Sequence, residues 1–199
     1  MLSGPLEALA AAFGVVFLAE LGDKTQLMVL AFATRYRALP VILGVVAASV
    51  LVMGVSVLVG AALGSLIDVR LLQLIGGVIF LLFAAWTLLG REEAEEDIEA
   101  VARYRPRPRS GLRAAAVVAG TFVLAELGDK SMLAALTLAT QAEPLATWLG
   151  ATLALVGVSL IAAIVGRQIG ERVPRRLLRL VSAAAFALFG VLLVLDALI

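Results

Sequence analysis

Two nearly identical stretches decide how this chain is built: FLAELGDKTQL at residues 17–27 and VLAELGDKSML at residues 123–133. They lie 106 residues apart, and at this offset the surrounding sequence also matches without a gap. Residues 14–90 and 120–196 share 29 identities in 77 positions. A shared apolar composition does not by itself produce this agreement, so the pattern indicates two copies of one unit.

Long apolar stretches surround both motifs. The chain has 199 residues and is 62% hydrophobic, whereas soluble domains are about 45–50% apolar. Six apolar runs have, or approach, the ~20 residues of a spanning helix, and only the two that hold the motifs are interrupted by charge. The runs are 8–34, 41–67, 71–90, 114–142, 145–166 and 180–195. We therefore predict an all-α membrane protein with six transmembrane helices.

The repeat predicts the domain organisation. We expect a first three-helix repeat at 1–90, a charged cytoplasmic linker at 91–111 and a second three-helix repeat at 112–199. Because each unit has an odd number of spans, the second copy enters the membrane from the opposite face, which makes an inverted-topology repeat. Thirteen arginines fall on one predicted side and only Arg70 on the other. The positive-inside rule places the Arg-rich loops in the cytoplasm and both termini outside.

The motifs place charged side chains near the middle of the membrane. In each copy twelve uncharged residues, 8–19 or 114–125, precede the motif, and they make about 18 Å of helix in a ~30 Å core. Charge at this depth costs roughly 2.5–3.5 kcal/mol per residue, so these side chains must face one another, the bundle interior or water. They are Glu20, Asp23, Lys24, Glu126, Asp129 and Lys130.

Local geometry should bring the charges of each motif together. On a continuous helix, positions i, i+3 and i+4 share one face, so Glu20, Asp23 and Lys24 would project together. Gly22 and Gly128, within the motifs, have low helix propensity and mark a possible break. Such a break would free backbone carbonyl groups as additional ligands.

The charge balance suggests a cation site. Four carboxylates and two lysines leave a net charge of −2, which one divalent cation or two protons would neutralise. Cation and protons would then compete for the same carboxylates, as an antiporter requires. The chain has no His and no Cys, so any metal must be held by oxygen, which favours Mn²⁺, Ca²⁺ or Mg²⁺ over Zn²⁺ or Cu⁺.

Further polar residues of the motifs complete the predicted site. Thr25 and Ser131 offer hydroxyl oxygens, and Gln26 offers an amide oxygen where the second copy has Met132. Lys24 and Lys130 are predicted to be counter-ions. The alternative is that Glu–Lys pairs only hold helices together, but two copies at matched depth favour function, because a buried ion pair adds little stability. We expect Asp68, Glu143, Glu171 and Asp196, at the span ends, to be solvated.

A doubled E-x-G-D-[KR]-[ST] motif, on the first helix of each half, resembles that of the Gdt family of manganese and calcium cation/proton antiporters. The resemblance covers the whole chain and implies a compact bacterial member in the inner membrane. It implies a cation site of Glu20, Asp23, Glu126 and Asp129, assisted by Thr25 and Ser131, with Lys24 and Lys130 in the same polar cluster. The family often has a polar residue at the position of Met132, so this chain departs from the pattern there.

The predicted function is a secondary transporter that exchanges a divalent cation, Mn²⁺ or alternatively Ca²⁺, for protons through a mid-membrane carboxylate site. The ion is a substrate, no cofactor is expected, and the partners are the ion, protons and the lipid bilayer, without nucleic acid. The chain would act as a monomer or a homodimer.

The sequence leaves three other functions to compare with this one. One is an exporter of small organic cations or amino acids, of the lysine-exporter type. An intramembrane enzyme is disfavoured, since the chain has no Ser/His pair, no Cys nucleophile and no H-E-x-x-H motif. A purely structural membrane protein would tolerate neutralisation of the paired acids.

Overall fold

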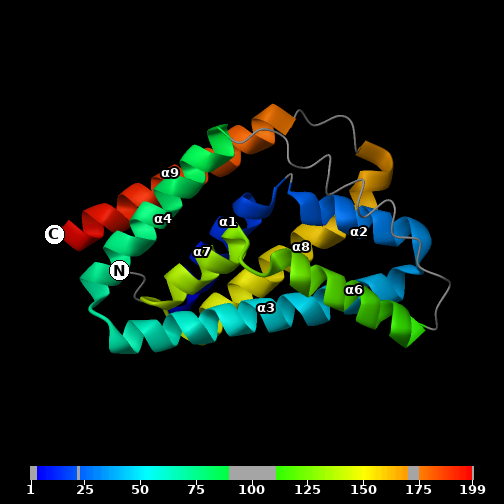
Figure 1. Cartoon of the computed structure of the whole chain (residues 1–199), viewed down its shortest axis with the longest axis horizontal. Helices are drawn as coiled ribbons and strands as arrows, with labels where there is room; N and C mark the ends of the chain where they lie inside the picture. Colours follow the sequence, from blue (N-terminus) through cyan, green and yellow to red (C-terminus); the bar gives the residue numbers. More distant parts are fainter. Residues whose placement is uncertain (1–3, 22, 90–110, 170–174, 199) are drawn as a thin grey trace.

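The computed structural model describes residues 4–21, 23–89, 111–169 and 175–198. All regular structure within these ranges is α-helical (Figure 1). The helices are α1 (Pro5–Glu20), α2 (Lys24–Arg35), α3 (Ala38–Leu66), α4 (Val69–Leu89), α6 (Gly111–Glu126), α7 (Lys130–Ala139), α8 (Pro144–Ile169) and α9 (Arg175–Leu198). The linker predicted at 91–111 falls outside the described residues except for Gly111, where α6 begins.

Several of these helices are long and apolar enough to cross a membrane. Three qualify on their own, over Ala38–Leu66, Arg70–Leu89 and Pro144–Ile164, and α6 with α7 qualifies as one span bent by 73°. The described residues thus contain three candidate spans by length and composition, or four with the bent pair. The membrane character is confirmed, while the count of six spans stays a prediction.

Acidic residues set the starts of two spanning helices. The Asp68 carboxylate accepts hydrogen bonds from the backbone N–H groups of Arg70, at 2.9 Å, and Leu71, at 3.3 Å. Glu143 accepts one from the N–H of Leu145, at 3.0 Å, just after Pro144 opens α8. These bonds satisfy N–H groups that have no partner within the helix. Both carboxylates are exposed, as the sequence predicted for the span ends.

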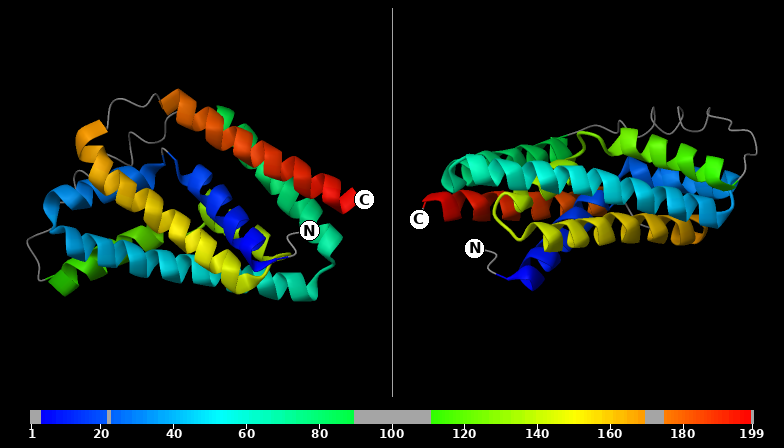
Figure 2. Two further views of the ribbon diagram at one scale, coloured as in Figure 1. Left: turned by 180° about the vertical axis from the view of Figure 1, so that it is seen from behind. Right: turned by 90° about the horizontal axis from the view of Figure 1, so that it is seen from below.

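Helices from the two halves of the chain pack against each other. Helix α1 lies along α8, α3 along α6, and α4 along α9, the last pair being the clearest in Figures 1 and 2. Gly44 of α3 brings its Cα close to the backbone of α6 at Ala115, and Gly150 of α8 does the same to α1 at Leu9. Both glycines and both partners are 106 residues apart in sequence. The repeat detected in the sequence therefore has equivalent contacts in space.

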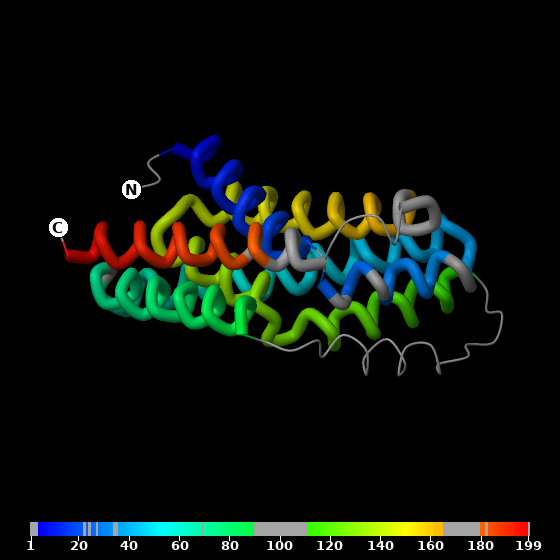
Figure 3. The backbone as a smooth tube through the Cα atoms, turned by 90° about the horizontal axis from the view of Figure 1, so that it is seen from above, coloured from blue at the N-terminus to red at the C-terminus, as the bar shows by residue number. Residues whose placement is uncertain are grey.

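Aromatic rings join α4 to α9. Phe80 and Phe186, which are 106 residues apart, place their ring centroids 5.8 Å from each other. Both side chains are almost completely buried. Figure 3 shows the start of α1 and the end of α9 at the same end of the molecule. This frame positions the two motif segments in the interior of the bundle.

Candidate functional site

Both motifs interrupt a helix. Helix α1 ends at Glu20 and α2 begins at Lys24, while α6 ends at Glu126 and α7 begins at Lys130. Gly128 has a φ of +78°, a left-handed conformation that residues with a Cβ adopt only at a cost. The break predicted from the low helix propensity of glycine is therefore present in both copies, although Gly22 itself lies outside the described residues.

A turn, and not helical periodicity, brings the charges of each motif together. The backbone N–H of Asp23 donates to the carbonyl of Glu20 at 3.1 Å, and that of Asp129 donates to the carbonyl of Glu126 at 3.1 Å. Asp23 and Asp129 then precede α2 and α7 with extended backbones, and neither side chain caps its helix. The prediction that Glu20, Asp23 and Lys24 share one face of a continuous helix was wrong for Glu20 and Asp23, because the helix is broken between them.

The two glutamates are the most deeply buried acids of the described chain. Glu20 and Glu126 both have an exposed fraction of 0%. The hydroxyl of Thr25 donates to Oε2 of Glu20 at 2.9 Å, and the hydroxyl of Ser131 donates to Oε2 of Glu126 at 3.1 Å. In both residues Oε1 is buried and has no hydrogen-bond partner among the described residues. An ionised carboxylate in this state is costly unless a cation or a proton balances it.

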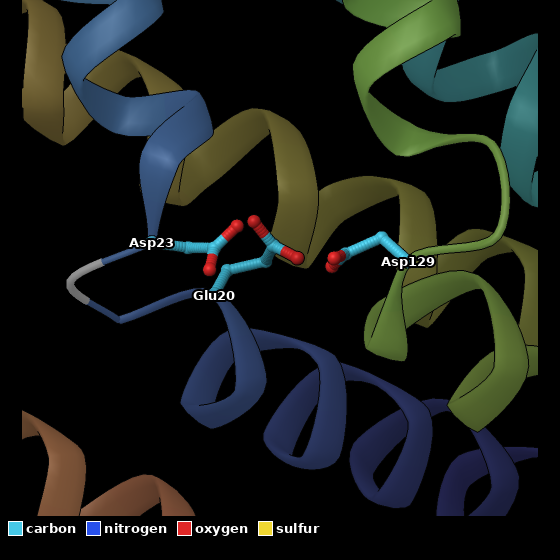
Figure 4. A group of neighbouring side chains, drawn as sticks. All are labelled: Glu20, Asp23 and Asp129. Atoms are coloured by element: carbon cyan, nitrogen blue, oxygen red, sulfur yellow. The ribbon is translucent and has the colours of Figure 1, made fainter. Parts of the chain in front are cut away.

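Three carboxylates converge at the breaks. One oxygen each from Glu20, Asp23 and Asp129 lies within 4.8 Å of the others, and Figure 4 shows the three groups pointing toward one another. Oxygens that bind one Ca²⁺ at about 2.3–2.6 Å can be no more than about 5 Å apart, so this spacing suits a single hard cation. Two of the acids come from the first half and one from the second, so neither half forms the cluster alone.

The other predicted ligands lie around this cluster. Glu126 is not among the three converging groups, but it is near enough to Glu20 for the two carboxylates to interact electrostatically. The amide nitrogen of Gln26 donates to the backbone carbonyl of Glu20 at 2.6 Å, at the end of α1. At the matching position of the second copy, Met132 Sδ accepts a hydrogen bond from the N–H of Gly128 at 3.4 Å. The side chains of Gln26 and Met132 thus each form a hydrogen bond that stabilises the backbone at the helix break of their own motif.

An ion pair connects the two halves at the cluster. Lys130 Nζ lies 2.7 Å from Asp23 Oδ1, and the two side chains are 20% and 15% exposed. The counter-ion predicted at Lys130 therefore contacts a carboxylate of the opposite copy, which the motif pattern did not indicate. The side chain of Lys24 lies outside the described residues.

A second cluster of hydrogen-bonded polar side chains was not predicted from the sequence. Gln73 of α4 is 3% exposed, and its amide nitrogen donates to Gln141 Oε1 at 2.9 Å and to Asp196 Oδ2 at 2.6 Å. Asp196 is exposed, as predicted for a span end, but it is also tied to this buried amide. The sequence feature that could have indicated this cluster is Gln73, the single glutamine within the apolar run 71–90.

A helical membrane protein whose broken helices gather buried carboxylates has the features of the cation-transporter class. A family profile described as "Divalent cation/proton antiporter GDT1" matches residues 8–95 and 114–199. The chain belongs to this GDT1 family. It is accordingly a membrane transporter and not an enzyme, and the match does not favour the lysine-exporter alternative.

Individual relatives agree with this assignment. The chain is 29% identical over 189 residues to a Vibrio cholerae protein named "Putative manganese exporter", covering 93% of this chain and 89% of the relative. It is 27% identical over 198 residues to a GDT1-like protein of Synechocystis, covering 94% and 96%. A chloroplastic GDT1-like protein of Oryza sativa is 37% identical over 89 residues, or 45% of this chain and 26% of the relative. No solved structure matches the chain significantly.

Proposed function

We propose that this protein exchanges Mn²⁺ for protons across the membrane, with Glu20, Asp23 and Asp129 as the central ligands of the ion. The observation that carries this proposal is the convergence of three carboxylate oxygens, from both halves, within 4.8 Å of one another. Oxygen donors of this kind suit hard divalent cations. The name of the Vibrio relative supports Mn²⁺ as the cargo, and Ca²⁺ is the competing ion to test.

Proton exchange follows from the charge of the site. With Glu126, the motifs hold four carboxylates and two lysines, a net charge of −2 when all are ionised. Either Mn²⁺ or two protons balances this charge, so the ion and the protons exclude one another. Thr25 and Ser131 orient the glutamates through the hydrogen bonds described above. Gln26 contributes by holding the end of α1, with its amide oxygen as a further ligand to test.

For alternating access we propose six spans arranged as an inverted repeat. The equivalent contacts of Gly44 and Gly150 support two structurally matched halves. Broken helices at the interface of such repeats are the usual place for an ion site in secondary transporters. The Arg-rich loops would face the cytoplasm, with both termini outside.

Reconstituted proteoliposomes test the proposed function. A pH gradient should drive Mn²⁺ into vesicles that hold the wild-type protein, and Asp23→Asn and Glu20→Gln should abolish this uptake. Asp68→Asn is a matched control, because it makes the same chemical change at an exposed residue, where asparagine is an equally good helix cap. Normal uptake by folded Asp23→Asn and Glu20→Gln would refute the assignment of the site. If Ca²⁺ is taken up in preference to Mn²⁺ when both ions are present, the transported ion is Ca²⁺ instead.

A further inference from the structure

We propose that Lys130 is a tethered competitor of the transported ion: its ammonium group occupies Asp23 and drives the ion out of the site. The inference rests on the proposed cation site and adds to it a residue that sets the affinity for the ion. Its basis is the contact of 2.7 Å between Lys130 Nζ and Asp23 Oδ1. The lysine comes from the second half and the aspartate from the first, and Asp23 is also one of the three converging carboxylates.

The Lys130 ammonium group is close enough to the carboxylate cluster to compete with a bound ion for Asp23. An ion bound to an Asp23 oxygen at the usual metal–oxygen distance would lie no more than roughly 7 Å from Lys130 Nζ. Like charges at this range repel strongly where little water screens them, and Lys130 is only 20% exposed. The second oxygen of Asp23, Oδ2, is buried and has no hydrogen-bond partner among the described residues. Asp23 thus has one oxygen paired with the lysine and a second oxygen that remains available to an ion.

This arrangement suits transport better than tight storage. A cluster of carboxylates without a competing cation would hold a divalent ion firmly and release it slowly. A lysine that returns to Asp23 as the ion leaves replaces one positive partner by another. The carboxylate is then not left with an uncompensated buried charge. Lys130 would therefore lower the affinity for the ion and raise the rate of release.

A purely structural role for the pair predicts the opposite result. If Lys130 only ties the two halves together, its neutralisation should loosen the site and weaken ion binding. If it competes, neutralisation should tighten ion binding. The direction of the change in affinity therefore separates the two roles.

The test measures Mn²⁺ binding to the purified full-length protein by the loss of the EPR signal of free Mn²⁺. Lys130→Gln removes the charge but keeps a donor for Asp23, and Lys130→Met keeps the aliphatic stem. Both should bind Mn²⁺ more tightly, on the order of tenfold, and should transport it more slowly in vesicles. Lys130→Arg keeps the charge and should bind nearly as the wild type does. Arg70→Gln, which removes a positive charge from an exposed position at the start of α4, should leave binding unchanged.

A double-mutant cycle locates the effect. In an Asp23→Asn background, where Mn²⁺ binds more weakly and is titrated to higher concentration, Lys130→Gln should tighten binding by a smaller factor than in the wild type, because the contact with Asp23 is lost and only the through-space repulsion remains. Unchanged or weaker binding by folded Lys130→Gln would overturn the inference, and so would loss of folding in both neutral variants. Wild-type protein that binds no Mn²⁺ would instead refute the proposed function. The two failures are thus distinguishable.

Discussion

Replacing Gly128 by alanine tests whether the break before α7 depends on a left-handed backbone. Gly128 has a φ of +78°, and a Cβ added there would meet no atom within 4 Å. The new methyl group therefore causes no clash, and the whole effect comes from the backbone. A residue with a Cβ in this conformation costs about 1–2 kcal/mol relative to glycine. We expect Gly128→Ala to lower the free energy of unfolding by that amount.

The same substitution in a neighbouring helix should have the opposite sign. Gly120 lies within α6, eight residues earlier, and a Cβ added there also meets nothing within 4 Å. In a helix, alanine is about 0.8–1 kcal/mol more favourable than glycine. The two alanine variants should therefore differ by about 2–3 kcal/mol. Gly128→Asn should lose less than Gly128→Ala, since asparagine tolerates the left-handed region better.

Unfolding in mixed micelles with increasing SDS, followed by tryptophan fluorescence, measures these differences. The chain has two tryptophans, Trp86 and Trp148, in different helices, so their signals also check that unfolding is cooperative. Binding of Mn²⁺ should weaken in Gly128→Ala and not in Gly120→Ala, because only the first change alters the turn before Asp129. Equal stability of the two alanine variants would refute the reasoning.

Three further predictions concern the polar groups. Thr25→Val should lower the thermal midpoint of unfolding, because Glu20 Oε2 loses its hydrogen-bond donor, which costs about 1–3 kcal/mol of stability. Saturating Mn²⁺ should reduce the difference in midpoint between the variant and the wild type; an equal difference with and without Mn²⁺ would contradict this. Gln73→Leu should also lower the midpoint, by removing its bonds to Gln141 and Asp196, but Mn²⁺ should not recover that loss. Mn²⁺ affinity should rise from pH 6 to pH 8 with release of protons, because only ionised carboxylates bind the ion; calorimetry in buffers of different ionisation enthalpy measures this, and a flat profile would disprove competition.

Much of the candidate site was predictable because it is encoded in a repeated local pattern. Glu20, Asp23 and Asp129 stand out as acids inside apolar runs, and a bilayer makes such residues costly unless they have a role. The glycines within the motifs likewise pointed to a break, since glycine is a poor helix former. The repeat also made clear that both halves would contribute.

The partners of these residues could not be predicted from spacing. The pair of Lys130 with Asp23 joins residues 107 positions apart, and it depends on how the ends of two broken helices meet. Gln26 illustrates the same point, because its amide group stabilises the end of α1 by a contact that its place in the motif does not reveal. Helical periodicity predicted the wrong arrangement for Glu20 and Asp23, because it holds only where the helix is continuous, and α1 ends at Glu20.

The sequence by itself determined that the chain enters a membrane, that it consists of two related halves and that acids lie within its apolar runs, because composition and repetition are properties of the chain alone. Only the tertiary structure decided which carboxylates converge and which lysine opposes them. The physical reason is that a turn, unlike a helix, has no fixed period. Where its side chains point is set by the packing of the helices on either side.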